Sequence, residues 1–390
     1  MTGGEGPTGK ISCSGWEEIY GQDRAVGFLR EILRRGEVPH ALLFTGPRGI
    51  GKYSTALLFA AALLCASGEP DGCSSCRKVA RGVHPDVHVL EAEGSVIRRE
   101  QVTSLERELN RKPAEAAARV AIIDEAHIMN QEAANAFLKT LEEPPPGTYI
   151  ILVAESKEIM LPTVISRSHE VRFSSLGRRD IEEFLMNREG LEPGEAERLA
   201  RLSGGIFGRS LLWAREPELA SYWNRGVELA STLHRSSLAV VLEEAEVARE
   251  LLGEVETSSG LDEEKLEEYV RAMDKRSGDR LKKRWEERRK RETAKMRRQA
   301  TLDMFDGMSS FYRDIMLLNL VEEGGRSASE SLLLNLEWRE EVERGALHTG
   351  TAEAMRRLEA LQRARKAVEA NVDLALVMDS LLLELRSIRK

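Results

Sequence analysis

The chain has 390 residues, of which 57 are basic and 65 acidic, so its formal net charge is −8. This length accommodates two or three domains of roughly 150 residues each and excludes a peptide hormone or a small disulfide scaffold. The acidic balance gives no overall attraction to nucleic acid, so any DNA contact must be local.

No segment is apolar for long enough to cross a membrane. The longest unbroken apolar run, Ala56–Ala66, is far shorter than the ~20 residues that a transmembrane helix needs. The N-terminus is Gly-rich and polar and lacks the apolar core of a signal peptide. We therefore expect a flexible tail over residues 1–15, a cytoplasmic protein and no membrane partner.

Short apolar runs alternate with helical patterns from residue 16 to about residue 175. The expected strands are Ala41–Thr45, Val87–Leu90, Val120–Ile123, Tyr149–Ala154 and Val171–Phe173, and the expected helices are Gly51–Ala66, Arg98–Arg111 and Gln131–Glu143. This alternation predicts an α/β domain with a parallel sheet. Short helices broken by glycines over 176–215 predict a small helical domain, and the helical periodicity over 216–390 predicts an all-α domain.

A glycine-rich loop, Gly46-Pro-Arg-Gly49-Ile-Gly51-Lys52, follows the first expected strand and precedes a helix. Backbone N–H groups of such a P-loop surround a phosphate, and Lys52 can reach its oxygens. Tyr53 occupies the position where a Ser or Thr hydroxyl would meet Mg²⁺, and Ser54 lies about 100° further round the helix. The loop either binds ATP and Mg²⁺ weakly or is vestigial, retained for structure alone.

Two acids, Asp124 and Glu125, end the apolar strand that begins at Val120. Asp124 can hold Mg²⁺ through its water shell, and Glu125 can orient an attacking water, the two roles that a nucleotide hydrolase requires. Both acids are relics if no metal binds.

Three cysteines, Cys65, Cys73 and Cys76, have the close spacing of a zinc site. The disulfide alternative is disfavoured because the cytoplasm keeps thiols reduced. A fourth ligand is expected three residues after Cys76, where Val79 stands; His84 and Cys13 are substitutes with poorer spacing. The cluster is either a zinc site or a metal-free remnant.

The C-terminal part contains two adjacent segments of opposite charge. Residues 242–270 carry 11 acidic and 2 basic side chains, and residues 275–298 carry 13 basic and 4 acidic ones. Two solvated or mutually attracting helices are favoured over a DNA-binding segment, because few aromatic residues accompany the charges.

Several motifs together resemble one family. They are Trp16…Gly21-Gln22, the cysteine cluster, His84-Pro-Asp86, the segment from Ala133 to Pro146, and Leu161-Pro-Thr-Val-Ile-Ser-Arg167-Ser168. The chain resembles clamp-loader subunits of bacterial DNA polymerase III. The resemblance implies a three-domain AAA+ chain, with a P-loop domain, a helical lid and a C-terminal collar that mediates oligomerisation. It also implies gamma/tau and delta subunits, a sliding clamp and primer-template DNA as partners.

The family contains an ATPase motor, gamma/tau, and a stationary delta-prime type. The motor would have Ser or Thr at Tyr53, a polar Thr or Asn pair at Glu155-Ser156, and an arginine where Gly208 stands. This sequence is therefore more similar to the delta-prime type, with the motor as the alternative.

The resemblance also implies a role for Arg167. In the family a Ser-Arg-Cys motif presents an arginine finger to the ATP of the neighbouring subunit, and here the motif reads Ser166-Arg167-Ser168. A cation at the γ-phosphate stabilises charge that develops in phosphoryl transfer. Without the resemblance, a surface salt bridge would be the preferred interpretation of Arg167.

Overall fold

The computed structural model describes residues 11–92, 96–233, 236–255, 275–321 and 332–388. The chain divides into two compact units, Gly9–Leu211 and Leu212–Lys390. Among the described helices, none has the length and apolar character of a membrane span. The division into four segments at residues 15, 175 and 215 stays a prediction.

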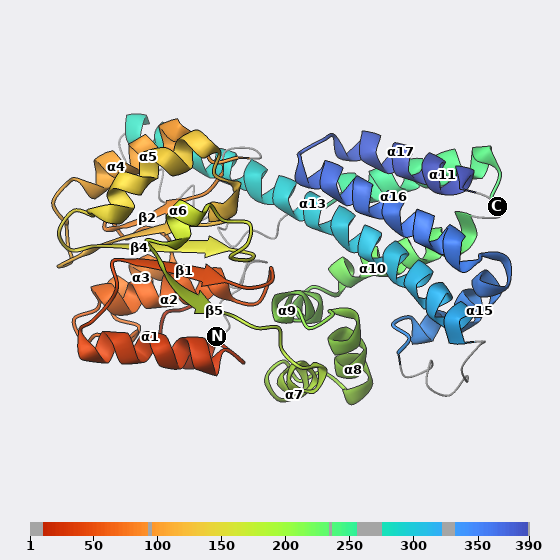
Figure 1. Cartoon of the computed structure of the whole chain (residues 1–390), viewed down its shortest axis with the longest axis horizontal. Helices are drawn as coiled ribbons and strands as arrows, with labels where there is room; N and C mark the ends of the chain where they lie inside the picture. Colours follow the sequence, from red (N-terminus) through yellow and green to blue (C-terminus); the bar gives the residue numbers. More distant parts are fainter. Residues whose placement is uncertain (1–10, 93–95, 234–235, 256–274, 322–331, 389–390) are drawn as a thin grey trace. The chain divides into compact units, whose positions relative to one another are not determined.

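A five-stranded parallel sheet organises the first unit (Figure 1). Its order is β2-β3-β4-β1-β5, which places β1 between the central strand β4 and the edge strand β5, with the segment that follows β1 at the carboxyl edge of the sheet. The strands are β1 (Ala41–Thr45), β2 (Val87–Leu90), β3 (Arg119–Ile123), β4 (Thr148–Ala154) and β5 (His169–Arg172). The predicted α/β class and parallel sheet are confirmed.

Helices cover both faces of this sheet (Figure 1). They are α1 (Asp23–Arg35), α2 (Lys52–Leu64), α3 (Ser74–Ala80), α4 (Arg99–Leu109), α5 (Gln131–Glu142) and α6 (Pro162–Ile165). The side chains of β1 alternate between two apolar cores: Leu42 and Phe44 face the core that contains α1 and α2, and Leu43 faces the core that contains α4 and α5. This two-sided burial explains why the strand is a continuous apolar run.

Six of the eight predicted elements have boundaries that were wrong by one or two residues, and two of these differences have clear local reasons. Strand β5 begins at His169 and not at Val171, because an edge strand pairs through its backbone and tolerates polar side chains facing solvent. Helix α2 begins at Lys52, since Gly51 has a φ of 94° and is therefore left-handed.

Residues 11–15 are packed against the first unit. Ile11 and Cys13 are buried, and the backbone N–H groups of Ser12 and Ser14 donate to the Glu18 carboxylate. The expected flexible tail is therefore wrong for these five residues; residues 1–10 lie outside the described part of the chain.

Three short helices follow the sheet. They are α7 (Arg178–Arg188), α8 (Pro193–Leu202) and α9 (Phe207–Arg215). Tyr20, Phe184 and Phe207 form an aromatic cluster with ring centroids 4.6 to 5.6 Å apart. This cluster fixes α7 and the start of α9 against the segment that precedes α1.

The described part of the second unit contains helices and connecting loops and no strand, as the predicted all-α class requires. It contains α10 (Pro217–Leu233), α11 (Leu238–Gly253), α13 (Lys275–Val321), α15 (Arg339–His348), α16 (Thr351–Glu369) and α17 (Leu374–Ser387). Helices α10 and α13 cross with their backbones in close approach: a Cβ at Gly226 would lie 2.0 Å from the Met304 oxygen, and one at Gly307 would lie 2.2 Å from the Trp223 oxygen.

Two arginines at the end of the predicted basic segment bind backbone oxygens at helix ends. Arg297 donates to the oxygen of Gly253, the last residue of α11, at 2.5 Å. Arg298 donates to the oxygen of Glu369, the last residue of α16, at 2.6 Å and to the side-chain Oδ1 of Asn371 at 2.9 Å. A helix C-terminus favours such cations. Of the predicted acidic segment, residues 256–270 lie outside the described chain.

Candidate functional site

The P-loop connects β1 to α2 at the carboxyl edge of the sheet. Its glycines Gly46, Gly49 and Gly51 have φ values of 146°, 75° and 94°, which side chains with a Cβ rarely adopt. At Gly46 a Cβ would also lie 2.4 Å from the Phe173 oxygen. The three glycines therefore build the loop, whether or not a phosphate binds there.

Lys52 is directed into its own loop. Its Nζ donates to the Gly46 and Pro47 oxygens at 2.6 Å each, and the side chain is buried. Burial lowers the pKa of Lys52 to about 8, against the opposing effects of the Glu155 and Asp124 carboxylates. Asp124 thus lies close enough to the P-loop lysine to act on its charge, while the roles predicted for both residues stay predictions.

Glu125 meets the P-loop through an ion pair. Its Oε1 lies 3.2 Å from the Arg48 guanidinium, and both side chains are partly exposed. Glu125 has a φ of 48°, a left-handed conformation that costs energy for a residue other than glycine, and its N–H donates to Asp124 Oδ1 at 3.0 Å. In this arrangement the carboxylate expected to orient water is bound to a cation of the same chain.

The helical segment after the sheet contacts the tip of the P-loop. The N–H of Gly208 donates to the Gly49 oxygen at 2.7 Å, and a Cβ at Gly208 would lie 2.5 Å from that oxygen. Residue 208 is the position at which the resemblance predicts an arginine in the motor type. No side chain fits there without moving α9 away from Gly49.

Tyr53 and Ser54, the two residues after Lys52, are both half-buried. Tyr53 packs against the apolar core on the α2 side of the sheet. The next buried hydroxyl is that of Thr55, which donates to the Gly51 oxygen at 2.8 Å. Tyr53 therefore contributes to packing.

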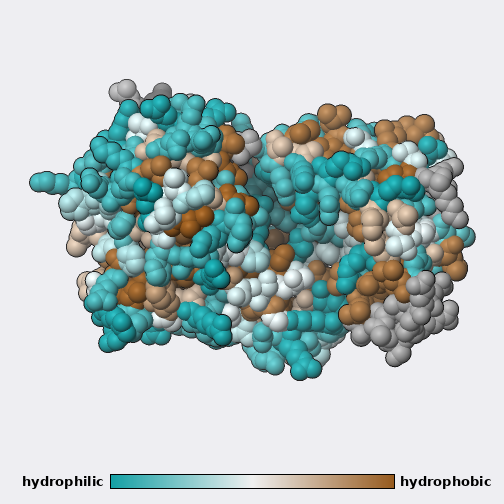
Figure 2. Space-filling view, viewed as in Figure 1, coloured by the Kyte–Doolittle hydropathy of each residue, from teal (hydrophilic) through white to brown (hydrophobic). Residues whose placement is uncertain are grey.

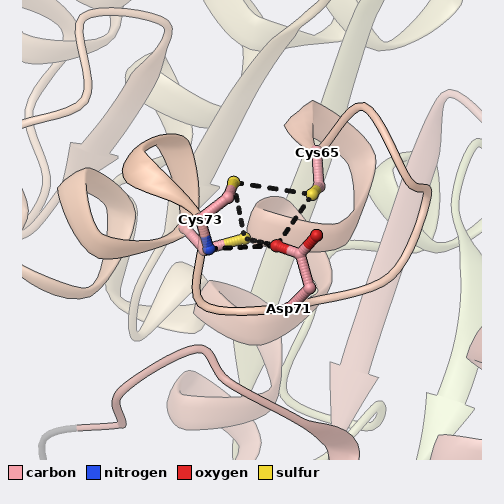
Figure 3. A group of neighbouring side chains, drawn as sticks. Cys65, Asp71 and Cys73 are labelled. Atoms are coloured by element: carbon pink, nitrogen blue, oxygen red, sulfur yellow. Dashed lines mark hydrogen bonds between the residues drawn. The ribbon is translucent and has the colours of Figure 1, made fainter.

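The three predicted cysteines come together with an acid that the sequence analysis missed. Figure 3 shows Cys65, Asp71 and Cys73 directed toward one another. The ligand atoms of these residues and Cys76 all lie within 4.8 Å of one another. The Sγ atoms of Cys65 and Cys73 are 3.6 Å apart, as are those of Cys73 and Cys76.

The donor set fits a tetrahedral zinc ion. Zn–S bonds of ~2.3 Å imply S···S separations of about 3.8 Å, and S···O separations to a carboxylate of about 3.6 Å. Asp71 Oδ1 lies 3.3 Å from Cys65 Sγ and 3.6 Å from Cys76 Sγ. The Cys73 N–H donates to Asp71, which lowers the pKa of that carboxyl to about 2 and keeps it ionised.

The substitutes considered for the fourth ligand have other roles. His84 shares a hydrogen bond with Ser75 Oγ through Nε2, and its Nδ1 accepts from the Asp86 N–H. Val79 is buried in the apolar core. Cys13 is also buried, and burial raises the pKa of its thiol to about 12. Asp71 is therefore the fourth member of the cluster.

The His84-Pro85-Asp86 motif has a structural role, because Asp86 binds the backbone of another segment. Its carboxylate is fully buried and accepts hydrogen bonds from the N–H groups of residues 114, 115 and 116 at 2.6 to 2.9 Å. It holds the segment that leads into β3.

Arg167 follows the short helix α6. Its side chain is 31% exposed and forms an ion pair with Glu142, the last residue of α5. Among the contacts of the described residues, none joins Arg167 to the glycines of the chain's own P-loop.

A P-loop between β1 and α2 of a five-stranded parallel sheet, followed by short helices that contact the loop, is the architecture of an AAA+ type of fold. Residues 21–177 match the family model described as "DNA polymerase III, delta subunit". The chain is 32% identical to the DNA polymerase III subunit delta' of Bacillus subtilis over 224 residues, which cover 56% of this chain and 68% of that protein. The chain belongs to this delta-prime family of clamp-loader subunits.

The chain is also similar to subunits with other names. The Escherichia coli DNA polymerase III subunit tau is 32% identical over 213 residues, which cover 52% of this chain and 33% of that protein. A solved structure from Thermotoga maritima, titled a DNA polymerase III gamma subunit-related protein, is 15% identical with a TM-score of 0.43 and covers 92% of this chain and 99% of its own.

Proposed function

We propose that this chain is the stationary, delta-prime-type subunit of a cytoplasmic clamp loader and hydrolyses little ATP itself. The observation that carries the proposal is the contact between Gly208 and Gly49 across the P-loop. Lys52 and Glu125, the groups that a bound nucleotide and its water would need, are paired inside the chain as well. A nucleotide must displace these contacts before it can bind productively.

Nucleotide binding and turnover by the isolated chain, with and without Mg²⁺, test this proposal. We expect weak ATP binding that depends little on Mg²⁺, because Tyr53 replaces the metal-binding hydroxyl, and negligible hydrolysis. Steady turnover that Glu125→Gln abolishes would establish the alternative, an active motor subunit of the gamma/tau type.

The proposed contribution to catalysis is Arg167, acting on ATP held by a neighbouring gamma/tau-type subunit. Its partial exposure supports a role in trans. Loss of an arginine finger costs roughly 10³–10⁵ in rate at its own site. In a ring with several sites, Arg167→Ala should slow the clamp- and DNA-stimulated ATPase of the assembled complex only in part. An unchanged rate in a fully assembled Arg167→Ala complex would contradict the role.

The other proposed partners are a delta-type subunit, the sliding clamp and primer-template DNA. The C-terminal helices support assembly with other subunits, because several of their large apolar side chains are exposed. These include Leu238, Leu242 and Val247 on α11 and Leu376 and Leu383 on α17. Figure 2 shows hydrophobic surface over α17. Exposed apolar groups of this kind indicate an interaction surface.

We propose that Cys65, Asp71, Cys73 and Cys76 hold one structural zinc ion. Bound zinc would connect the end of α2 to α3 and stabilise the intervening loop. Purified wild type should contain about one zinc per chain, Asp71→Ala should lose it to a mild chelator, and Asp71→Cys should keep it. Full zinc retention by Asp71→Ala would exclude Asp71 as a ligand.

A further inference from the structure

The guanidinium of Arg167 is bound within its own chain on all three nitrogens. Its Nε donates to Glu142 Oε1 at 2.7 Å, and one terminal nitrogen donates to the same oxygen. The other terminal nitrogen donates to the Thr163 oxygen at 2.9 Å and to Ser166 Oγ at 3.1 Å. The side chain therefore lies along α5 and α6.

The edge of the guanidinium that Glu142 occupies is one that binds oxyanions. Nε and a terminal nitrogen form a planar fork that matches two oxygens of a carboxylate or a phosphate. A phosphate approaching this edge must therefore displace the Glu142 carboxylate.

The position of Glu142 is unfavourable for α5 itself. It is the last residue of that helix, where the partial negative charge of the helix end disfavours a carboxylate. The ion pair with Arg167 compensates for this repulsion. Because the two side chains are 51% and 31% exposed, the pair is weak and open to exchange.

We propose that Glu142 is a positioning residue. Its carboxylate holds the Arg167 guanidinium along α5, an arrangement called parking below, until the phosphate of a neighbouring subunit's ATP displaces the carboxylate. This inference rests on the proposed role of Arg167 in trans. Parking keeps the guanidinium ordered and neutralised until an oxyanion competes for it. Removing the carboxylate therefore makes Arg167 available to the phosphate more often.

The test uses the assembled clamp loader and compares Glu142→Gln with Glu143→Gln. Gln keeps the size of the side chain and removes its charge. Glu143 is the adjacent exposed acid, and among the described contacts it makes none with Arg167. We expect Glu142→Gln to raise the rate at the one site that Arg167 serves roughly two- to fivefold, the population change that an exposed ion pair supports, and to raise kcat/KM for ATP of the whole complex by less. Glu143→Gln should have no effect.

Two further measurements separate parking from the role in trans. In an Arg167→Ala background, Glu142→Gln should no longer change the rate. In the chain alone, proton exchange at Arg167 Nε, followed by NMR, should be slow in wild type and several-fold faster in Glu142→Gln.

The outcomes distinguish the two ideas. An unchanged or lower kcat/KM in Glu142→Gln, in a complex that Arg167→Ala does slow, would overturn parking. Equal Nε exchange in wild type and Glu142→Gln would overturn it regardless of the ATPase. If Arg167→Ala leaves the ATPase unchanged, the role in trans fails, whatever the exchange rates show.

Discussion

Gly208→Ala tests the contact that closes the P-loop. A Cβ at this position would lie 2.5 Å from the Gly49 oxygen, whereas ordinary contacts begin at 3.4 Å, so α9 must move by about 0.9 Å. Overpacking of this kind costs about 1–3 kcal/mol, and the reduced freedom of the unfolded chain returns about 0.4–1 kcal/mol. The expected net loss of unfolding free energy is about 1–2 kcal/mol. For a unit of about 200 residues, this lowers Tm by about 2–8 °C.

Calorimetry on the full chain measures this shift, and amide exchange at residue 208 reports the loss of its bond to Gly49. Gly194→Ala is the matched control. Gly194 is likewise the second residue of its helix, and no described heavy atom lies within 4 Å of the added Cβ. The control should gain about 0.4–1 kcal/mol. If Gly208→Ala is stabilised to the same extent, the contact does not hold the loop closed.

Three further predictions follow from single side chains. Burial lowers the pKa of Lys52 to about 8, so the unfolded chain binds more protons than the folded chain between pH 8 and about 10.4. As the pH rises through this range, the unfolding free energy of wild type should therefore increase relative to that of Lys52→Met, as measured by urea unfolding at each pH. Asp86→Asn removes the charge from a buried carboxylate that holds three N–H groups and should cost about 3 kcal/mol in the same assay. Arg167→Lys should restore little of the ATPase lost in Arg167→Ala, because a single ammonium lacks the planar fork; full rescue would show that charge alone suffices.

The sheet and the P-loop were predictable because local patterns determine them. Strand β1 is apolar on both faces, and the glycines after it have positive φ values that the loop requires. The juxtaposition of Asp124 with Lys52 follows from the parallel sheet, since the carboxyl ends of its strands lie at one edge.

Asp71 was missed because it belongs to no regular element. It stands in a polar loop between Gly68 and Gly72, whose φ values of 72° and 71° turn the chain back toward Cys65. Residue spacing alone does not reveal that return. An acid two residues before Cys73 was the available signal.

The pairing of Arg167 with Glu142 was not predictable from local sequence. The two residues are 25 positions apart, and their contact depends on how α5 packs against α6. The contact between Gly208 and Gly49 likewise joins residues far apart in the sequence, one in a helix after the sheet and the other in the P-loop. Such contacts follow from tertiary packing, which propensity and periodicity do not specify.

Arg297 and Arg298 alter what the basic run of α13 can offer to an outside polyanion. Their guanidinium groups already serve as caps for the ends of α11 and α16. A guanidinium that binds a helix end does not neutralise a DNA phosphate, so it releases none of the counterions condensed on the DNA. The formal charge of the 275–298 stretch therefore overstates the salt dependence that any such encounter would display.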